Sequence, residues 1–419
     1  MDDGVSLGYT LYTPDGAAPA GGWPGVVVLH GLAGTRGSVD AISSSFAAAD
    51  YAVLAYDARG HGSSGGLITL AGPREVADLR AVRNAFAGRA NVSDTKIGAW
   101  GISYGGGQIW NALAAGVPFA AAEVVETWTS LYDALWPQNL ARSGIVAGFA
   151  ASVAARSPLI TSLRDAAVQS TNPAAIRQLT AERSALSKAG SIRTPVYVFH
   201  GRTDFAFDLS QATRAYTHLS GPKRLYVGTF GHTPSTFPGP DIAFVLAEGR
   251  AWFDSHVKGV GPDMKPRVTV ASQSGKRTTF SGLPKTRTQT FTLGGRSVLR
   301  GGSVATRQTP LLRAALESWG GGTATVTVPK LASYPRLVVT VLAGQKVVAH
   351  GGLKPKAGLN RVTLANYCVY VPRGTRLRVS IGASSPAGQI AYLGFPGSGS
   401  ATIGAVTLKL STLAKPVSG

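Results

Sequence analysis

The chain has 419 residues, of which 44% are hydrophobic and 15% are charged, and its net charge is +20. This composition excludes an intrinsically disordered chain, and the length exceeds one ordinary core, so we expect two domains. No apolar run is long enough to span a bilayer. Cys368 is the only cysteine, which excludes an internal disulfide and a metal site built from several thiolates.

The first residues carry little targeting information. No signal peptide precedes the first expected strand, and the opening Met1-Asp2-Asp3 resembles a start placed on a mature sequence. We therefore expect a secreted protein, with a cytoplasmic one as the alternative. The seven histidines show no metal-ligand spacing, and we expect neither a metal nor a cofactor.

The charge is distributed unevenly along the chain. Residues 1–262 carry 20 Lys and Arg against 19 Asp and Glu, whereas residues 263–419 carry 21 against 2. The net charges of the two parts are therefore +1 and +19. The change falls near the turn-rich segment Gly259-Val260-Gly261-Pro262. We expect one domain over residues 1–262 and a basic one over residues 263–419.

The first part alternates apolar runs with helical patterns, which predicts a mainly parallel sheet covered on both faces. The expected strands are 25–30, 52–56, 96–101, 120–125, 196–201 and 224–228, and the expected helices include 74–86, 209–219 and 241–257. The connection from about 128 to 193 is too long for one crossover and carries helical patterns at 140–155, 157–169 and 172–189. We predict that it forms a helical cap over the carboxyl edge of the sheet, where ligands bind in such folds.

A Gly-x-Ser-x-Gly motif follows the third of these strands and precedes a helical pattern. It reads Gly101-Ile102-Ser103-Tyr104-Gly105, with Gly106 behind it. Strand, motif and helix in this order are typical of a nucleophile elbow, in which the tight turn around the serine requires neighbours without bulk. The motif predicts that Ser103 is a nucleophile.

A serine nucleophile needs a base, and the base needs an acid that fixes its tautomer. In this fold the chain order is serine, acid, histidine. Asp204 follows the strand at 196–201, and His232 lies in a glycine loop beyond the strand at 224–228. Asp208 is the competing acid, but its place favours capping of the helix that begins near 209. We predict a triad of Ser103, His232 and Asp204.

Two backbone N–H groups are expected to stabilise the oxyanion. One is that of Tyr104, which follows the nucleophile. The other is that of Leu32, in the loop after the first long strand, where Gly31 lets the chain bend. We expect His30 to orient this loop rather than to take part in the reaction.

The residues described so far resemble the α/β-hydrolase fold, and Gly-Ile-Ser-Tyr-Gly-Gly resembles the superfamily of cocaine esterases and X-Pro dipeptidyl-peptidases (CocE/NonD). The second part supports this resemblance, since short strand patterns separated by Gly and Pro predict an all-β sandwich. They lie at 267–271, 288–292, 323–328, 336–342, 345–350, 361–364, 377–381 and 402–410. Residues 371–380 are similar to a segment of the family's C-terminal jelly-roll domain. Relatives often place a tyrosine side chain in the oxyanion hole, where this sequence has Leu32.

The resemblance implies hydrolysis of an ester or amide through an acyl-enzyme, without a cofactor. Trp128, Tyr132, Trp136 and Phe205 predict an apolar, aromatic acyl pocket, and we favour esters of apolar or aromatic acids, a range that extends to polyesters. The alternative is an X-Pro dipeptidyl-peptidase-like amide hydrolase. Such an enzyme needs a carboxylate for the substrate ammonium, for which Glu126 is the best candidate, although the cap is short for a dipeptidyl-peptidase. A structural role for Glu126 is the competing interpretation.

The basic second domain suggests a partner. A domain with a net charge of +19 favours binding to an anionic surface such as a wall polymer, an acidic polysaccharide, lipid headgroups or nucleic acid. Solubility and docking on the first domain are the competing explanation. No nucleic-acid-binding motif is present, and basic charge alone does not indicate specific nucleic-acid binding.

Overall fold

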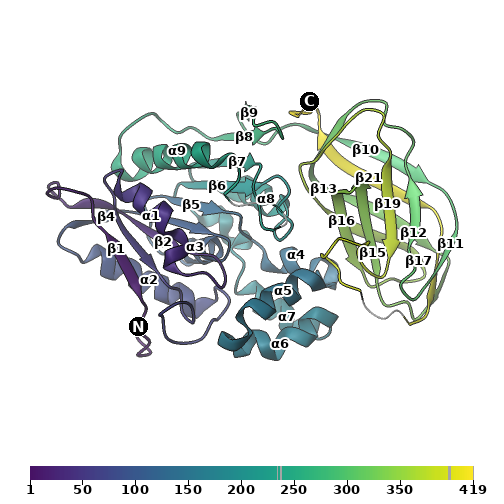
Figure 1. Cartoon of the computed structure of the whole chain (residues 1–419), viewed down its shortest axis with the longest axis horizontal. Helices are drawn as coiled ribbons and strands as arrows, with labels where there is room; N and C mark the ends of the chain where they lie inside the picture. Colours follow the sequence, from purple (N-terminus) through teal and green to yellow (C-terminus); the bar gives the residue numbers. More distant parts are fainter. Residues whose placement is uncertain (234, 236–237, 395–397, 419) are drawn as a thin grey trace.

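The computed structural model describes residues 1–233, 235, 238–394 and 398–418. Within them, the first part of the chain forms a nine-stranded sheet of order β1-β3-β2-β4-β5-β6-β7-β8-β9 (Figure 1). The strands are β1 (Tyr9–Tyr12), β2 (Trp23–Leu29), β3 (Ala52–Tyr56), β4 (Val92–Ile102), β5 (Ala122–Val125), β6 (Val196–Gly201), β7 (Lys223–Gly228), β8 (Arg267–Ala271) and β9 (Arg277–Phe280). Neighbours from β3 to β8 run parallel, and only β1 and β9 pair antiparallel, at the two edges. The mainly parallel sheet is confirmed.

Helices cover both faces of this sheet, which explains why its strands read as continuous apolar runs. In β2, Val27 and Leu29 belong to the core on one face, and Val26 and Val28 to the core on the other. The first face is covered by α2 (Pro73–Ala87), α3 (Tyr104–Ala114) and α8 (Ser210–His218), and the second by α1 (Asp40–Ala47) and α9 (Ile242–Phe253). The sheet therefore holds its strand ends rigidly between two buried layers.

The long connection between β5 and β6 is helical. It contains α4 (Leu131–Leu135), α5 (Ser143–Val153), α6 (Pro158–Gln169) and α7 (Pro173–Ala181), which lie together beside the sheet (Figure 1). Helix α6 begins at a Ser-Pro pair: the Ser157 side chain accepts the N–H of Ile160 at 3.3 Å, and Pro158 takes the first helical position. Residues of α5 and α6 share a cavity with Ser103, so these helices lie over the carboxyl ends of the strands.

The second part is an antiparallel β sandwich, as expected. One sheet has the order β10-β21-β13-β17-β16-β15-β19-β12, with β18 paired to β13, and a smaller sheet has the order β11-β20-β14. The bounds are β10 (Thr286–Leu293), β11 (Ser297–Arg300), β12 (Ala305–Gln308), β13 (Leu316–Val328), β14 (Lys330–Ala332), β15 (Leu337–Ala343), β16 (Lys346–Leu353), β17 (Gly358–Asn366), β18 (Tyr370–Val371), β19 (Leu377–Gly382), β20 (Ser400–Ile403) and β21 (Val406–Leu413). The finer jelly-roll topology stays a prediction.

Two strand predictions need correction. The run 267–271 was expected to open the sandwich, but it is β8, which pairs parallel with β7 in the first sheet. The first sheet continues to Phe280, and we therefore propose a domain boundary between β9 and β10, later than the predicted 262. The run 402–410, expected as one strand, is divided into β20 and β21 at Gly404 and Ala405.

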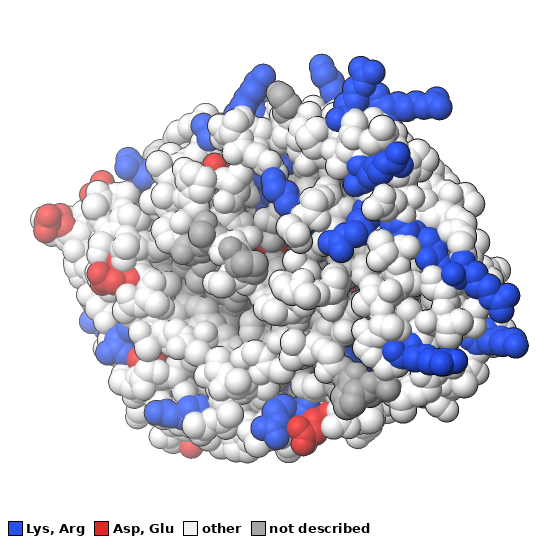
Figure 2. Space-filling view, turned by 45° about the vertical axis from the view of Figure 1, so that its right-hand side comes forward, with Lys and Arg blue, Asp and Glu red and all other residues white. Residues whose placement is uncertain are grey.

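The surface of the sandwich is cationic. From residue 264 to 418, the described acidic residues are limited to Glu317, which is fully buried. Exposed Lys and Arg come from several strands, among them Arg300 on β11, Lys346 on β16, Arg361 on β17 and Lys409 on β21. Figure 2 shows blue side chains along the right-hand side of the molecule, where the sandwich lies, without red ones among them. The charge asymmetry of the sequence is therefore an asymmetry of the surface.

The sandwich contacts the loop that follows β6. Arg202, at the start of this loop, forms an ion pair with Glu317, and its carbonyl accepts the N–H of Cys368 at 2.8 Å. Arg142, at the start of α5, donates to the carbonyl oxygens of Phe205 and Ala206 in the same loop. The loop is thereby held by the cap and the sandwich together.

Candidate active site

Ser103 lies at the turn from β4 to α3 in a strained conformation, with φ 53° and ψ −112°. Its N–H donates to the carbonyl of Val125 at 2.8 Å. The glycines around it are required by space: a Cβ at Gly101 would lie 2.7 Å from the backbone carbon of Gly105, and one at Gly105 would lie 2.6 Å from Leu29. The turn therefore has the geometry expected of a nucleophile elbow.

The structure brings His232 and Asp204 to this serine. The His232 Nε2 atom lies 2.8 Å from Ser103 Oγ, and His232 Nδ1 lies 2.7 Å from Asp204 Oδ2. The other carboxylate oxygen of Asp204 accepts the N–H groups of Ala206 at 2.9 Å and Phe207 at 3.0 Å. Asp208, the competing acid, accepts the N–H of Ser210 instead. Serine, imidazole and carboxylate form one continuous hydrogen-bonded chain.

The protonation states of Asp204 and His232 depend on their burial and on the groups that they contact. Burial by itself raises the pKa of Asp204, but the His232 imidazole, with smaller contributions from His200 and the backbone N–H of Phe207, holds it below its ordinary value. Burial by itself lowers the pKa of His232, but the Asp204 carboxylate raises it above its ordinary value, with a smaller contribution from Glu126. This arrangement stabilises an imidazolium, which is what a general base needs when it accepts a proton.

Leu32 and Tyr104, the residues predicted to supply the oxyanion donors, line the same cavity as Ser103. Within the described residues, the N–H groups of Leu32 and Tyr104 have no protein acceptor. The loop before Leu32 is held by His30, whose Nε2 accepts the N–H of Ala58 at 3.0 Å and whose Nδ1 bonds the carbonyl of Gly31 at 2.7 Å. Burial lowers the pKa of His30 to about 4, so the ring is neutral and suited to both bonds.

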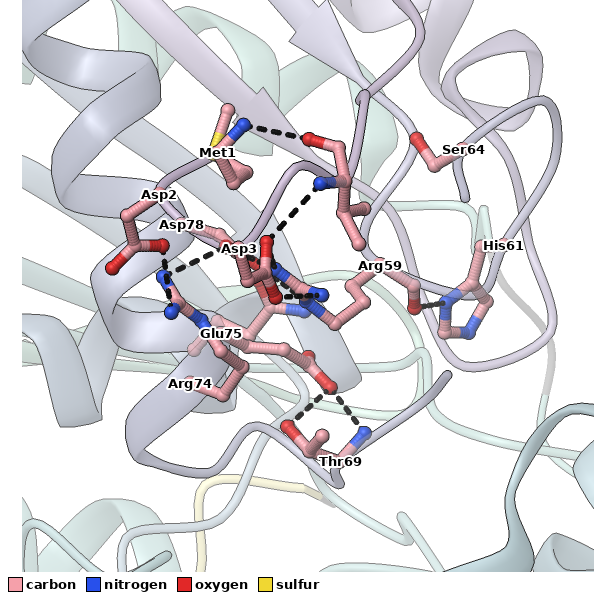
Figure 3. A network of polar contacts seen from close by, with 12 residues as sticks. Met1, Asp2, Asp3, Arg59, His61, Ser64, Thr69, Arg74, Glu75 and Asp78 are labelled. Carbon is pink, nitrogen blue, oxygen red and sulfur yellow. Dashed lines mark hydrogen bonds and ion pairs between the residues drawn. The ribbon is translucent and has the colours of Figure 1, made fainter. Parts of the chain in front are cut away.

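The side chain of Tyr104 is anchored by a buried acid that the sequence did not single out. The Tyr104 hydroxyl donates to Glu75 at 2.8 Å and accepts the N–H of Ala71 at 2.9 Å. Glu75 also accepts the N–H and the hydroxyl of Thr69 (Figure 3). In the same network, Arg59 joins Asp78 to Asp3. The only sequence signal for Glu75 was an acid in the first turn of a helix, which is too common to indicate a site.

An apolar cavity opens at Ser103 beneath the cap. The space between its walls, including open solvent at its mouth, is about 750 Å³. Its lining residues are mostly aliphatic or aromatic and include Leu32, Leu70, Ser103, Tyr104, Trp128, Leu131, Leu135, Trp136, Val146, Phe149, Ala150, Leu159, Ile160, Leu163, Ala167, Leu179 and Phe207. No carboxylate is among the described lining residues, and Arg164 is the one charged residue among them. The cavity suits an apolar group attached to the atom that Ser103 attacks.

A second, more polar cavity meets the first at Leu32, Ser103 and Phe149. It is lined in addition by Gly31, Ser38, Val39, Ile42, Trp100, Ile102, Glu126, Gly231, His232 and Thr233. His232 lines this cavity and does not line the apolar one.

The aromatic residues predicted to bind substrate divide into two sets. Trp128 and Trp136 line the apolar cavity. Tyr132 and Phe205 do not, and these two assignments need correction. Tyr132 lies on α4 one residue beyond Leu131, which turns it about 100° away from the cavity, and its hydroxyl bonds Asn139. Phe205 packs between the two domains.

Phe207 takes the place that Phe205 was expected to fill, because the turn held by Asp204 directs Phe207 inward. Its ring lies edge-on to the His232 ring, with 5.2 Å between the centroids. Phe149 and the other lining residues of the cap were missed, since their helical pattern also fits an ordinary core.

Glu126, the residue proposed for a substrate ammonium, is only 2% exposed and lies beside His232. Its carboxylate, that of Asp204 and the His232 ring offer ligand atoms that all lie within 4.8 Å of one another, a donor set that suits a metal such as zinc. Both ring nitrogens of His232 are already engaged, however, by Ser103 and Asp204. The geometry therefore favours proton transfer over metal binding.

The fold and the site define an α/β-hydrolase. Residues 3–234, more than half of the chain, match the family described as X-Pro dipeptidyl-peptidase (S15 family). The chain belongs to this family.

Solved structures agree in fold over nearly the whole chain, sandwich included. A CocE/NonD family hydrolase from Staphylococcus aureus has a TM-score of 0.75 and 15% identity, over 98% of this chain and 92% of that one. An aminopeptidase from the marine sediment archaeon Thaumarchaeota archaeon has a TM-score of 0.73 and 12% identity, over 99% and 95%. An α-amino acid ester hydrolase has a TM-score of 0.71 and 14% identity, over the same shares.

Curated relatives match a shorter segment. Two proteins from Escherichia coli, each described as an uncharacterized 31.7 kDa protein in the traX-finO intergenic region, are 28% identical over 116 residues, or 27% of this chain. The matched segment spans 39% of the length of these relatives. Among the described residues, none of the helices has the length and apolar character that crossing a membrane requires.

Proposed function

We propose that the protein is a serine hydrolase that cleaves carboxylic esters of apolar or aromatic acids, with Ser103, His232 and Asp204 as its catalytic triad. The observation that carries this proposal is the apolar cavity next to Ser103, without a carboxylate among its described lining residues. An acyl chain buried there leaves water, and each buried CH₂ contributes about 0.8 kcal/mol.

The reaction follows from the positions of the groups. Ser103 Oγ attacks the ester carbonyl while His232 Nε2 takes its proton, and Asp204 stabilises the imidazolium. The N–H groups of Leu32 and Tyr104 bind the oxyanion. The imidazolium then protonates the alcohol oxygen, which leaves through the second cavity. Water, activated by His232 in the same way, hydrolyses the acyl-enzyme.

Peptidase activity is the alternative within the family. The family description names X-Pro dipeptidyl-peptidases, and solved relatives are titled as an aminopeptidase and an α-amino acid ester hydrolase. A substrate with a free ammonium needs a carboxylate near the acyl site. The carboxyl group beside the triad is that of Glu126, which lines the second, more polar cavity and not the apolar one. This position favours an ester substrate without an amino group.

A comparison of ester and amide substrates on one plate distinguishes the esterase from the peptidase. We expect kcat/KM for p-nitrophenyl esters to rise from acetate to medium acyl chains, with little turnover of an Ala-Pro-arylamide. Preferred turnover of the arylamide would replace the proposal with a peptidase. We propose further that the substrates include polyesters and that the enzyme acts outside the cell, where such polymers occur. Clearing of a polyester film by the purified protein tests the proposed activity on polyesters.

A second role concerns the sandwich, whose described surface carries exposed cations without exposed acids from residue 264 to 418. This observation favours binding to an anionic surface, because like charges spread over a face attract polyanions and gain from counterion release. This second proposal concerns the surface to which the enzyme binds and not the reaction at Ser103.

A further inference from the structure

A second buried carboxyl group lies beside the triad. Glu126 follows β5 directly, and its Oε2 atom is 3.9 Å from His232 Nδ1, the nitrogen that Asp204 Oδ2 contacts at 2.7 Å. The side chain is 2% exposed, and its Oε1 atom has no hydrogen-bond partner among the described residues. Two carboxyl groups thus face one side of a single imidazole.

The position of Glu126 is energetically unfavourable in two respects. Its φ angle is 47°, in the left-handed region that is unfavourable for a residue with a side chain. A buried polar atom without a hydrogen-bond partner is unfavourable as well. A hydrophobic residue would avoid the second cost, and glycine the first. Strain of this kind persists mostly where the group has a function.

The two carboxyl groups are in different protonation states. Asp204 accepts two backbone N–H groups and the imidazole, which keep it ionised. Glu126 has no such donors. Its pKa is raised to about 8, mainly by burial and next by the negative charge of Asp204, while His232 lowers it by a smaller amount. At neutral pH, Glu126 therefore carries a proton beside a neutral imidazole, and it loses that proton more readily when the imidazole is charged.

We propose that Glu126 is a second acid of the triad: a positioning residue that titrates together with His232 and can replace Asp204 as the partner of Nδ1. This inference rests on the proposed function, because it assigns a role through His232 as general base. It differs from the ammonium-binding role predicted from the sequence, since Glu126 acts on the imidazole and not on the substrate.

Other titratable groups around the site do not offer the same contact. His200, on β6, bonds the carbonyl of Phe207 through Nε2, and burial lowers its pKa so that it is neutral. Asp208 is engaged by the start of α8. Arg142, His350 and Tyr367 lie on the far side of the loop that carries Asp204, at the contact with the sandwich. Glu126 and Asp204 are therefore the acids that set the state of His232.

The test compares Glu126→Gln, Asp204→Asn and the double variant, with p-nitrophenyl butyrate as substrate. Gln has nearly the same shape as the protonated Glu, so the fold is preserved. In Glu126→Gln, the rise of kcat/KM with pH should move to lower pH by roughly half a unit or more, because glutamine cannot lose a proton and so cannot become the negative partner of the imidazolium. The double variant should be at least roughly tenfold slower than Asp204→Asn, since the substitute acid is also lost.

Glu123→Gln is the matched control. Glu123 is a buried carboxyl on β5, the strand that ends just before Glu126; it is 2% exposed, and the structure records no contact between it and His232. It should leave the pH profile unchanged. Superimposable profiles of wild type and Glu126→Gln, together with equal rates of Asp204→Asn and the double variant, would overturn the inference. That result leaves the serine mechanism intact, whereas a fully active Ser103→Ala variant would reject the mechanism itself.

Discussion

Arg202 and Glu317 form an ion pair that is buried between the two domains, with side chains 2% and 0% exposed. Glu317 also accepts the N–H groups of Val417 and Ser418, at 2.6 and 3.0 Å. Arg202 lies two residues before Asp204, so the single buried acid of the sandwich holds the loop that carries the triad acid. The sandwich is therefore part of what positions the active site.

We expect Glu317→Gln to lower the free energy of unfolding by roughly 3–5 kcal/mol, because it leaves the Arg202 charge buried without a counterion. Urea unfolding measures this loss. The exposed pair of Arg214 and Asp133, with side chains 44% and 40% exposed, is the control. Asp133→Asn should cost at most about 1 kcal/mol. Equal small losses in both variants would show that the interdomain pair has no special role.

The pH dependence follows from the state of His232. Only the neutral imidazole accepts the serine proton, so kcat/KM should rise with pH through the pKa of His232, which Asp204 holds above its ordinary value against the effect of burial. Asp204→Asn should lower turnover on the order of 10² or more and move the rise to lower pH. Asp208→Asn should have far less effect. The reverse ranking of these two variants would mean that the acid is misassigned.

The acyl cavity predicts a change in chain-length preference. Ala150 lies on α5, is 4% exposed and lines the cavity. Ala150→Phe should reduce kcat/KM for a medium-chain ester by roughly 10-fold or more and leave that for the acetate nearly unchanged. Ala151→Phe, on the exposed side of the same helix, is the control. An equal loss for every acyl length would place the acyl group elsewhere.

The cationic sandwich predicts salt-sensitive binding by the whole protein. At low salt, it should sediment with vesicles that contain anionic lipid, and raised salt should release it. Neutralising the exposed Lys346, Lys354 and Lys356 to Gln should weaken this binding more than the same change at Arg89, Lys96 and Lys188, which are exposed on the first domain. Turnover of small soluble esters should not change. If both triple variants weakened binding equally, the binding would depend on the net charge of the protein alone and not on the sandwich surface.

Local patterns were enough to predict from the sequence that Ser103, Asp204 and His232 lie together. The turn at Ser103 requires glycines at fixed positions, and the order of strands places Asp204 and His232 at neighbouring strand ends. Pairing between distant segments was not predictable, because β8 carries the same apolar alternation whether it joins β7 or the sandwich.

The substrate side of the site was harder to predict. Aromatic residues near the cap entrance were chosen by type, and side-chain direction depends on one residue of helical rotation, which separates Tyr132 from Leu131. The role of Glu126 was equally difficult to predict from the sequence. An acidic residue after a strand is compatible with ligand binding and with an ion pair, and only the distance to His232 distinguishes these two roles.

The measurement that tests the central claim most directly is labelling by a serine-directed phosphonate, combined with turnover of Ser103→Ala. We expect the phosphonate to modify Ser103 alone, as located by peptide mass spectrometry. The alanine variant should stay folded, resist the label and lose turnover on the order of 10⁶. A label on another residue, or an alanine variant with wild-type turnover, would contradict the account.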